Sequence, residues 1–246
     1  MTTVTKNGAT YNYTYAGGSQ NEVLSESTPQ GQYKVTYGRT DAQGQPIIEQ
    51  LSKDAGTAYI EHDPVTGEPL MLRTSAGMTS LYITDGTGNP TALITSGNYV
   101  AVAYAYDPYG VQTITKDTGG NATDQTPYTF KNGLQDRTTG WVKYGARWYN
   151  PTTGRWTQQD TLDHPLDPGN ANRYAYAAND PINLSDPTGY SYGSCVAKSS
   201  ISGVIGGAAA GFVGGLLTAV LGPEAPIITA GPATLIGAVT VGPPQP

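Results

Sequence analysis

The side chains that most often bind metals or act as nucleophiles are scarce in this chain of 246 residues. Its single cysteine, Cys195, cannot form an internal disulfide and has no second thiolate for a structural zinc site. The two histidines, His62 and His164, lie far apart in the sequence, and we interpret both as ordinary turn residues. The sequence therefore predicts no metal site and no bound cofactor.

Aspartates remain as candidates for chemistry, and several of them precede a proline. An Asp-Pro step is typical of a turn, because aspartate caps the turn and proline fixes its φ angle. On spacing alone Asp186 is a turn residue like the others, which are Asp63, Asp107, Asp167 and Asp180. Arg147 and Arg155 each flank a tryptophan, so packing on an aromatic ring is the simpler interpretation of both arginines.

One set of aspartates recurs at a fixed interval of 22 residues. Each has a tyrosine shortly before it and a glycine shortly after it. The aspartates are Asp41, Asp63, Asp85 and Asp107. A period of this length indicates stacked repeats rather than a single globular core, and it excludes most enzyme folds. We interpret these four aspartates as structural.

Composition agrees with a turn-rich β protein. The chain contains 32 glycines, 18 prolines and 18 tyrosines, and charged residues make up 13% of it. Tyrosine suits a half-buried sheet face, because its ring is apolar while its hydroxyl stays polar. The net charge is −6 and no basic run occurs, so the sequence does not favour binding to nucleic acid or to an anionic membrane surface.

The elements that must position these residues are predicted to be β-hairpins. Within residues 1–120, stretches such as 80–84 and 98–106 are rich in strand-forming residues and lie between turn signals. A single hairpin cannot bury a face alone, so the hairpins are expected to pair edge to edge in one long antiparallel sheet. Residues 121–189, where aromatic residues and arginines interleave, show no helical period and are predicted to be non-helical.

Two parts of the chain carry recognisable motifs. Residues 106–110 read Tyr-Asp-Pro-Tyr-Gly, and residues 136–189 contain an ordered series that includes Ala-Arg-Trp-Tyr, Gly-Arg-Trp, Asn-Arg-Tyr-Ala-Tyr and Asp-Pro-Thr-Gly. The first resembles the YD repeat, and the series resembles the RHS repeat-associated core. The 22-residue repeats extend the resemblance upstream to about residue 30. Relatives in this family coil a sheet of YD repeats into a hollow shell, and the core motif closes one end of it.

The resemblance also implies a self-cleavage site. In the family, a variable C-terminal segment, often a toxin, is separated by cleavage just after the Asp-Pro-x-Gly motif. Matching the motifs assigns the catalytic roles to Asp160, Asp186 and Arg147, and places the cleaved bond between Tyr190 and Ser191, with Gly189–Tyr190 next. Two carboxyl groups in contact share a proton, so one can activate water while the other donates.

Two positions depart from the family pattern. Thr161 follows the first aspartate where relatives usually have proline, and Tyr190 stands where leucine is usual. Asp163 and Asp167 in the following linker remain alternatives for the first carboxylate. The three predicted segments are residues 1–120, the YD-repeat sheet; 121–189, the core; and 190–246, a hydrophobic tail.

The tail contains an uncharged stretch, Ile201 to Gly222, in which glycines recur every fourth residue. On a helix these glycines would share one face; they are Gly203, Gly207, Gly211 and Gly215. Three interpretations are open: a transmembrane helix with a closely packing glycine face, a flexible cargo held in a shell, and the remnant of a larger toxin. The tail has no histidine and one acidic residue, Glu224, so it shows no nuclease, transferase or hydrolase pattern.

These observations predict a mainly β, curved antiparallel sheet that forms a partial RHS shell. The implied function is that of a scaffold at the C-terminal end of an RHS-repeat toxin-type protein, with one single-turnover self-cleavage near residue 190. The alternative is a non-catalytic carrier or interaction module anchored to membrane by its glycine-zipper tail, and a pore former is a third hypothesis. Expected partners are the rest of a longer shell, the tail as cargo, or an immunity protein. Residues 1–12 contain no apolar run, so a cleavable secretory signal is not expected, although the full-length protein would be secreted or at the cell surface.

Overall fold

The computed structural model describes residues 1–190 except for Gln30, 42–43, Ala55, Asn98, 119–121 and 161–171. The predicted tail, 191–246, and with it the glycine row and Ser191, lies outside the described residues. Within the described part no helix is long and apolar enough to cross a bilayer.

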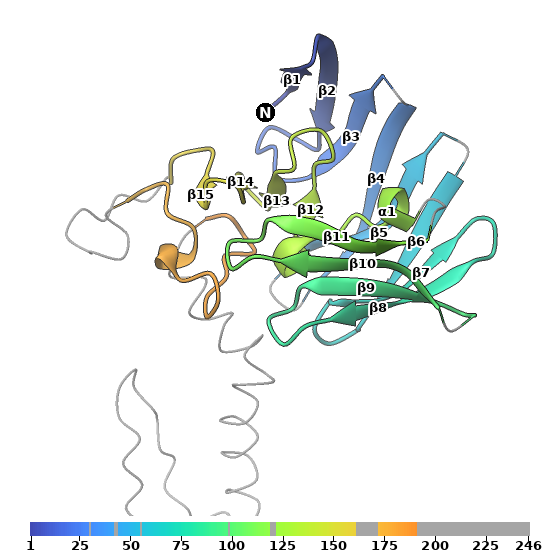
Figure 1. Cartoon of the computed structure of the whole chain (residues 1–246). Helices are drawn as coiled ribbons and strands as arrows, with labels where there is room; N and C mark the ends of the chain where they lie inside the picture. The colour runs from blue at the N-terminus through green and yellow to red at the C-terminus, as the bar shows by residue number, and fades with distance from the viewer. Residues whose placement is uncertain are drawn as a thin grey trace, which may run out of the picture.

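One large antiparallel sheet follows the chain without a crossover (Figure 1). Each of its eleven strands pairs with the next in sequence, and the sheet curves without closing. The strands are β1 (Thr3–Lys6), β2 (Ala9–Tyr15), β3 (Val23–Thr28), β4 (Gly31–Thr40), β5 (Pro46–Lys53), β6 (Gly56–His62), β7 (Pro69–Thr74), β8 (Thr79–Thr84), β9 (Pro90–Thr95), β10 (Val100–Tyr106) and β11 (Gln112–Asp117). The predicted mainly β fold with a curved antiparallel sheet is confirmed.

The 22-residue period corresponds to one hairpin of this sheet. Each periodic aspartate begins the turn that joins β4 to β5, β6 to β7, β8 to β9 or β10 to β11. In every turn the glycine amide donates to the aspartate carbonyl, and the glycine has a φ angle between 76° and 89°. Side chains other than glycine rarely adopt that angle. The aspartate carboxylate accepts further turn amides, for example Tyr109 N and Val111 N on Asp107 Oδ1 at 2.9 and 2.8 Å.

A smaller part of the chain covers the inner face of the sheet. It contains α1 (Ala122–Gln125), the 3-10 turns η1 (Phe130–Asn132) and η2 (Ala177–Asn179), and a four-stranded sheet of β12 (Leu134–Gln135), β13 (Val142–Tyr144), β14 (Arg147–Asn150) and β15 (Arg155–Trp156). The prediction of a non-helical segment is therefore wrong for these single helical turns.

Tyrosines join the two sheets, because their rings are buried while their hydroxyls reach polar partners. The Tyr13 hydroxyl donates to Asp136 at 3.0 Å, and the Tyr82 hydroxyl lies 2.8 Å from Thr126 Oγ1. These rings pack in one hydrophobic core with Tyr128 and Leu134 of the smaller part. The large sheet thus gives the smaller one a fixed surface on which to pack.

His62 is not the turn residue that the sequence predicted. It is the last residue of β6, its side chain is buried, and Nε2 lies 2.9 Å from the Tyr128 hydroxyl. Burial lowers the pKa of His62 to about 4, so the imidazole is neutral at physiological pH. The histidine supports the contact between the large sheet and the residues that cover it.

Candidate functional site

Two glycines bring the end of the described chain against the turn between β13 and β14. Gly145 and Gly189 both have positive φ angles, 38° and 64°. A Cβ atom on Gly145 would lie 2.1 Å from the Thr188 carbonyl oxygen, and one on Gly189 would lie 2.3 Å from the Tyr144 carbonyl oxygen. The Ala146 amide donates to the Thr188 carbonyl at 3.0 Å. Glycine is required at both positions for this approach.

Asp186 begins a turn of the same kind as the repeat turns. Its Oδ1 accepts the Gly189 amide at 3.0 Å and the Thr188 hydroxyl at 2.9 Å. Its Oδ2 lies 3.1 Å from Arg147 Nη2. Asp186 thus begins a turn, as its spacing predicted, and also contacts Arg147; the catalytic role that the motif implies stays a prediction.

Arg147 contacts both of the other predicted site residues, Asp160 and Asp186. Its Nη1 forms an ion pair with Asp160 Oδ2 at 2.8 Å, and Nη2 contacts Asp186. Its Nε donates to the Gly189 carbonyl oxygen at 2.7 Å. The guanidinium also lies 4.2 Å from the centre of the Trp156 ring, and the arginine is 5% exposed. One buried cation thus contacts two carboxylates and the peptide carbonyl next to the predicted cleavage position.

Arg147 packs on Trp156, which differs from the simpler interpretation that Arg147 and Arg155 each pack on an aromatic ring because each flanks a tryptophan. Trp156 packs with Arg147, nine residues earlier, while its neighbour Arg155 is exposed. No cation–π contact of Arg155 is found in the described part of the chain. Packing on tryptophan is thus found for Arg147, in addition to its carboxylate contacts.

A residue that the sequence analysis did not select, Arg173, holds Asp160 in place. The Asp160 amide donates to the Arg173 carbonyl at 2.9 Å, and Arg173 Nε and Nη2 both donate to the Asp160 carbonyl, Nε at 3.0 Å. Arg173 belongs to the Asn-Arg-Tyr-Ala-Tyr motif, which was the signal that could have identified it. Asp163 and Asp167 lie outside the described residues.

Burial dominates the electrostatics of Asp186. Desolvation raises the pKa of its carboxyl group, although the Thr188 hydroxyl, the Arg147 charge and the Gly189 amide each lower it. Of the two carboxyl groups on Arg147, Asp186 is the more buried. A buried carboxyl group with a raised pKa is suited to donating a proton.

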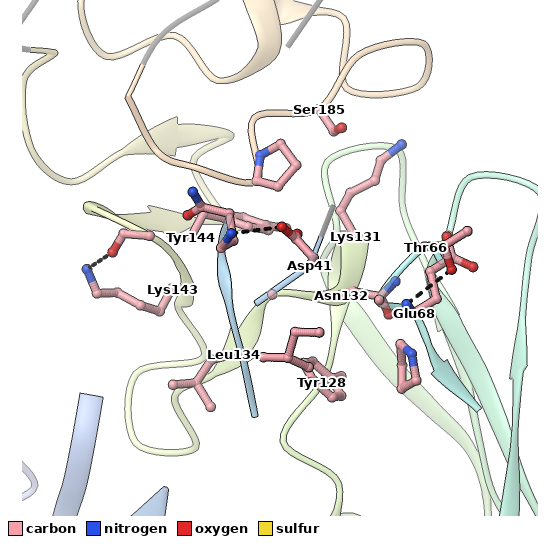
Figure 2. A pocket seen from close by; sticks show the side chains of 18 of the residues that line it. Asp41, Thr66, Glu68, Tyr128, Lys131, Asn132, Leu134, Lys143, Tyr144 and Ser185 are labelled. Carbon is pink, nitrogen blue, oxygen red and sulfur yellow. Dashed lines mark hydrogen bonds between the residues drawn. The ribbon is translucent and has the colours of Figure 1, made fainter. Parts of the chain in front are cut away.

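A cavity of about 750 Å³ lies beside this site (Figure 2). Its walls come from the row of repeat turns, including Asp41 and Glu68, and from the smaller sheet, including Lys143 and Tyr144. Tyr190, the last described residue, also lines it and is 43% exposed. The Asn21 amide donates to the Tyr190 hydroxyl at 2.8 Å, which links the end of the described chain to the start of the large sheet.

Parts of the sequence are similar to a known family and to a known protein. Residues 67–182 match the family described as Teneurin YD-shell. The salivary gland surface protein 1 of Aedes aegypti is 36% identical over 105 residues, which are 43% of this chain and 3% of that protein.

Two solved structures share the fold. A crystal structure of TcdB2-TccC3-TEV aligns with a TM-score of 0.53 and 16% identity over 75% of this chain and 9% of that one. A Photorhabdus luminescens Tc holotoxin pore with a mutated TccC3 aligns with a TM-score of 0.50 and 17% identity over 76% of this chain and 9% of that one. The chain therefore spans a small part of the length of the proteins that it matches.

The fold and the site define a class of protein: an open sheet of repeated hairpins with a small core sheet packed on its inner face. Residues 67–182 are thus similar to a YD-shell family, and the fold of the chain is that of the RHS/YD-repeat shell proteins.

Proposed function

We propose that the chain is the C-terminal part of an RHS-repeat toxin-type protein, in which residues 1–120 and 121–189 form a scaffold for the variable segment 190–246. The family match and the fold shared with Tc toxin components support this proposal. In the full-length context the protein is secreted, and its partners are the remaining repeats of a longer shell and its own C-terminal segment as cargo. An immunity protein would be a further partner if that segment is toxic.

The scaffold releases the variable segment by one self-cleavage near residue 190. The observation that carries this step is the position of Arg147, which contacts Asp160, Asp186 and the Gly189 carbonyl at once. A single arginine that holds two carboxyl groups, one protonated and one ionised, beside a peptide carbonyl assembles an acid, a base and a polarised bond in one place.

In the proposed hydrolysis, water attacks the peptide carbonyl carbon and gives a proton to the Asp160 carboxylate. Asp186, whose pKa is raised by burial, donates a proton to the departing amide nitrogen. The peptide C–N bond breaks, and the products are a carboxylic acid on the scaffold and an amine on the released segment. Arg147 stabilises the negative charge that develops on the carbonyl oxygen.

The two predicted cleavage positions differ in their support. The contact from Arg147 Nε polarises the carbonyl of the Gly189–Tyr190 bond. The motif resemblance favours the Tyr190–Ser191 bond, and Ser191 lies outside the described residues. Both bonds lie within five residues of Asp186 in the sequence, and fragment masses decide between them.

Intact-mass spectrometry of the freshly purified full chain tests the proposal. Cleavage after Tyr190 gives fragments of 190 and 56 residues (246 − 190 = 56). Asp186→Asn and Asp160→Asn preserve the side-chain shape and are expected to leave the chain intact. Asp180→Asn, which changes another Asp-Pro turn, is the matched control and is expected to cleave like the wild type. A wild type that stays intact over days would contradict self-cleavage.

A further inference from the structure

Two buried carboxyl groups meet where the first strands of the large sheet contact the smaller sheet. Glu26 lies on β3 and is 6% exposed, and Asp136, between β12 and β13, is 2% exposed. Thr138 bridges the two carboxyl groups, since its hydroxyl donates to Glu26 Oε1 at 2.6 Å and its amide donates to Asp136 Oδ1 at 3.2 Å. In the part of the chain that the structure describes, no basic side chain forms an ion pair with either group. The pair is separate from the Arg147 site.

Asp136 accepts more hydrogen bonds than Glu26 does. Asp136 accepts the Tyr13 hydroxyl at 3.0 Å, the Thr138 amide at 3.2 Å and the Thr139 amide at 3.1 Å, and it also accepts the Thr139 hydroxyl. Several donors on one carboxyl group stabilise the carboxylate form. Among the described residues, the Glu26 side chain accepts one hydrogen bond, from the Thr138 hydroxyl at 2.6 Å on Oε1. Glu26 is therefore the member that holds a proton.

We propose that Glu26 and Asp136 share one proton, and that this proton holds the β12–β13 hairpin on the first strands of the large sheet. Two carboxyl groups in buried contact cannot both ionise without strong repulsion. Loss of the proton places two negative charges in the contact, and the hairpin must then separate from β2 and β3 to admit water. The contact is a pH-dependent latch, and this inference does not depend on self-cleavage.

The expected pH range follows from the surroundings of Glu26. Burial and the charge of Asp136 raise the pKa of Glu26 to about 7. The other titratable or charged groups that face the pair are Tyr13 and Tyr15 on β2, Tyr33 on β4, and Arg137 next to Asp136; Lys6 on β1 donates to the Thr138 carbonyl.

The direction of the pH effect is set by the raised pKa. A folded-state pKa above the ordinary value of 4.5 means that the latch is complete below about pH 4.5 and is lost as the pH rises through about 7. Between about pH 4.5 and about pH 7 the equilibrium constant for opening the hairpin rises by up to about tenfold per pH unit, and above about pH 7 it levels off. Lys143 on β13, whose pKa burial lowers to about 7, titrates in the same range, so the test must change Glu26 alone.

Hydrogen exchange of the full chain measures the latch. Corrected for intrinsic rates, amide protection of residues 134–149 is expected to fall by about sevenfold between pH 5.5 and pH 6.5 in the wild type and to level off above about pH 7. Glu26→Gln keeps the shape of the side chain and supplies a permanent donor to Asp136, so its protection should not change over that range. Glu61→Gln, on the exposed side of β6, is the matched control and should behave like the wild type.

A carbon-13 titration of the wild-type carboxyl groups gives a second measurement that needs no variant. The Glu26 carboxyl resonance is expected to move with a midpoint near pH 7. The proposal is overturned if that midpoint lies in the ordinary range below pH 5, or if Glu26→Gln keeps the pH dependence of the wild type. If Glu26→Gln does not fold, the wild-type midpoint alone decides.

Discussion

At the scale of the residue, the site depends on how closely two backbone turns approach each other. Arg147 reaches Asp186 and the Gly189 carbonyl because the turns at Gly145 and Gly189 are in contact without side chains between them. Any substitution of Gly189 would destabilise the turn in two separate ways: a side chain rarely adopts its positive φ angle, and a Cβ atom would collide with the Tyr144 carbonyl oxygen. A comparison of Gly189 with Gly140, which has a positive φ angle but no atoms near an added Cβ, separates the two effects.

Gly189→Ala is expected to disrupt the site far more than Gly140→Ala. Both glycines have positive φ, 64° and 77°, so each variant loses about 1 kcal/mol of stability from backbone strain. Only at Gly189 would the new Cβ meet backbone atoms, whereas nothing lies within 4 Å at Gly140. Denaturant unfolding and intact mass measure stability and cleavage together. Equal losses in both variants would show that the contact at Gly189 is unimportant.

The buried His62 is expected to lower the free energy of unfolding in acid. Its folded-state pKa is lowered from 6.5 to about 4, so folding disfavours the protonated form. Stability is therefore full above about pH 6.5 and falls as the pH drops toward 4, by up to about 3 kcal/mol. His62→Gln retains a donor for the Tyr128 hydroxyl and cannot take a charge. Melting temperatures at pH 7 and pH 5 should differ less in the variant than in the wild type; an unchanged difference would assign the acid loss to other groups.

At the scale of the element, the sequence predicted the repeat turns and hairpins, because these depend on residues that are close in the sequence. The aspartate and glycine of each repeat specify a turn whose hydrogen bonds are all within a few residues, so the 22-residue spacing was enough to predict the hairpins. Contacts between distant elements were not predictable in this way. Trp156 packs on Arg147 rather than on its neighbour, Arg173 clamps Asp160, and His62 is buried, because each depends on how the smaller sheet lies on the large one.

The repeat turns are not equivalent, and Asp85 should matter more than Asp63. The Asp63 carboxylate accepts two turn amides, those of Val65 and Thr66. Asp85 also binds the Asn89 side chain at 2.8 Å, and buried Asn89 in turn accepts the Lys131 amide of the smaller part at 2.9 Å. Asp85→Ala is expected to cost about 2 kcal/mol, and Asp63→Ala is expected to cost less.

Denaturant unfolding of both variants measures this difference. Hydrogen exchange at residues 130–134 should also increase in Asp85→Ala and stay unchanged in Asp63→Ala, since only the Asp85 turn is connected to the smaller part. Identical losses in the two variants would mean that each turn contributes only its own hairpin.

At the scale of the whole molecule, the large sheet is open. Among the described strands, β1 and β11 are the two edge strands of the large sheet, and each pairs with another strand on one side only. All residues of β11 are exposed or half-buried, and Ile114 is 52% exposed. Edge strands of this kind pair readily with another strand. The sheet is thus suited to continuing into further hairpins of the same kind, as the proposed longer shell requires.

The isolated chain is expected to self-associate through this edge as its concentration rises. Ile114→Lys adds a charge to the edge strand and should shift sedimentation velocity profiles toward the monomer, because a buried charge opposes strand pairing. Leu81→Lys is the matched control: Leu81 is 55% exposed, but it lies on β8, which is paired on both sides, so association should not change. If Leu81→Lys disperses the chain as well as Ile114→Lys does, association occurs through an exposed face of the sheet rather than through its edge.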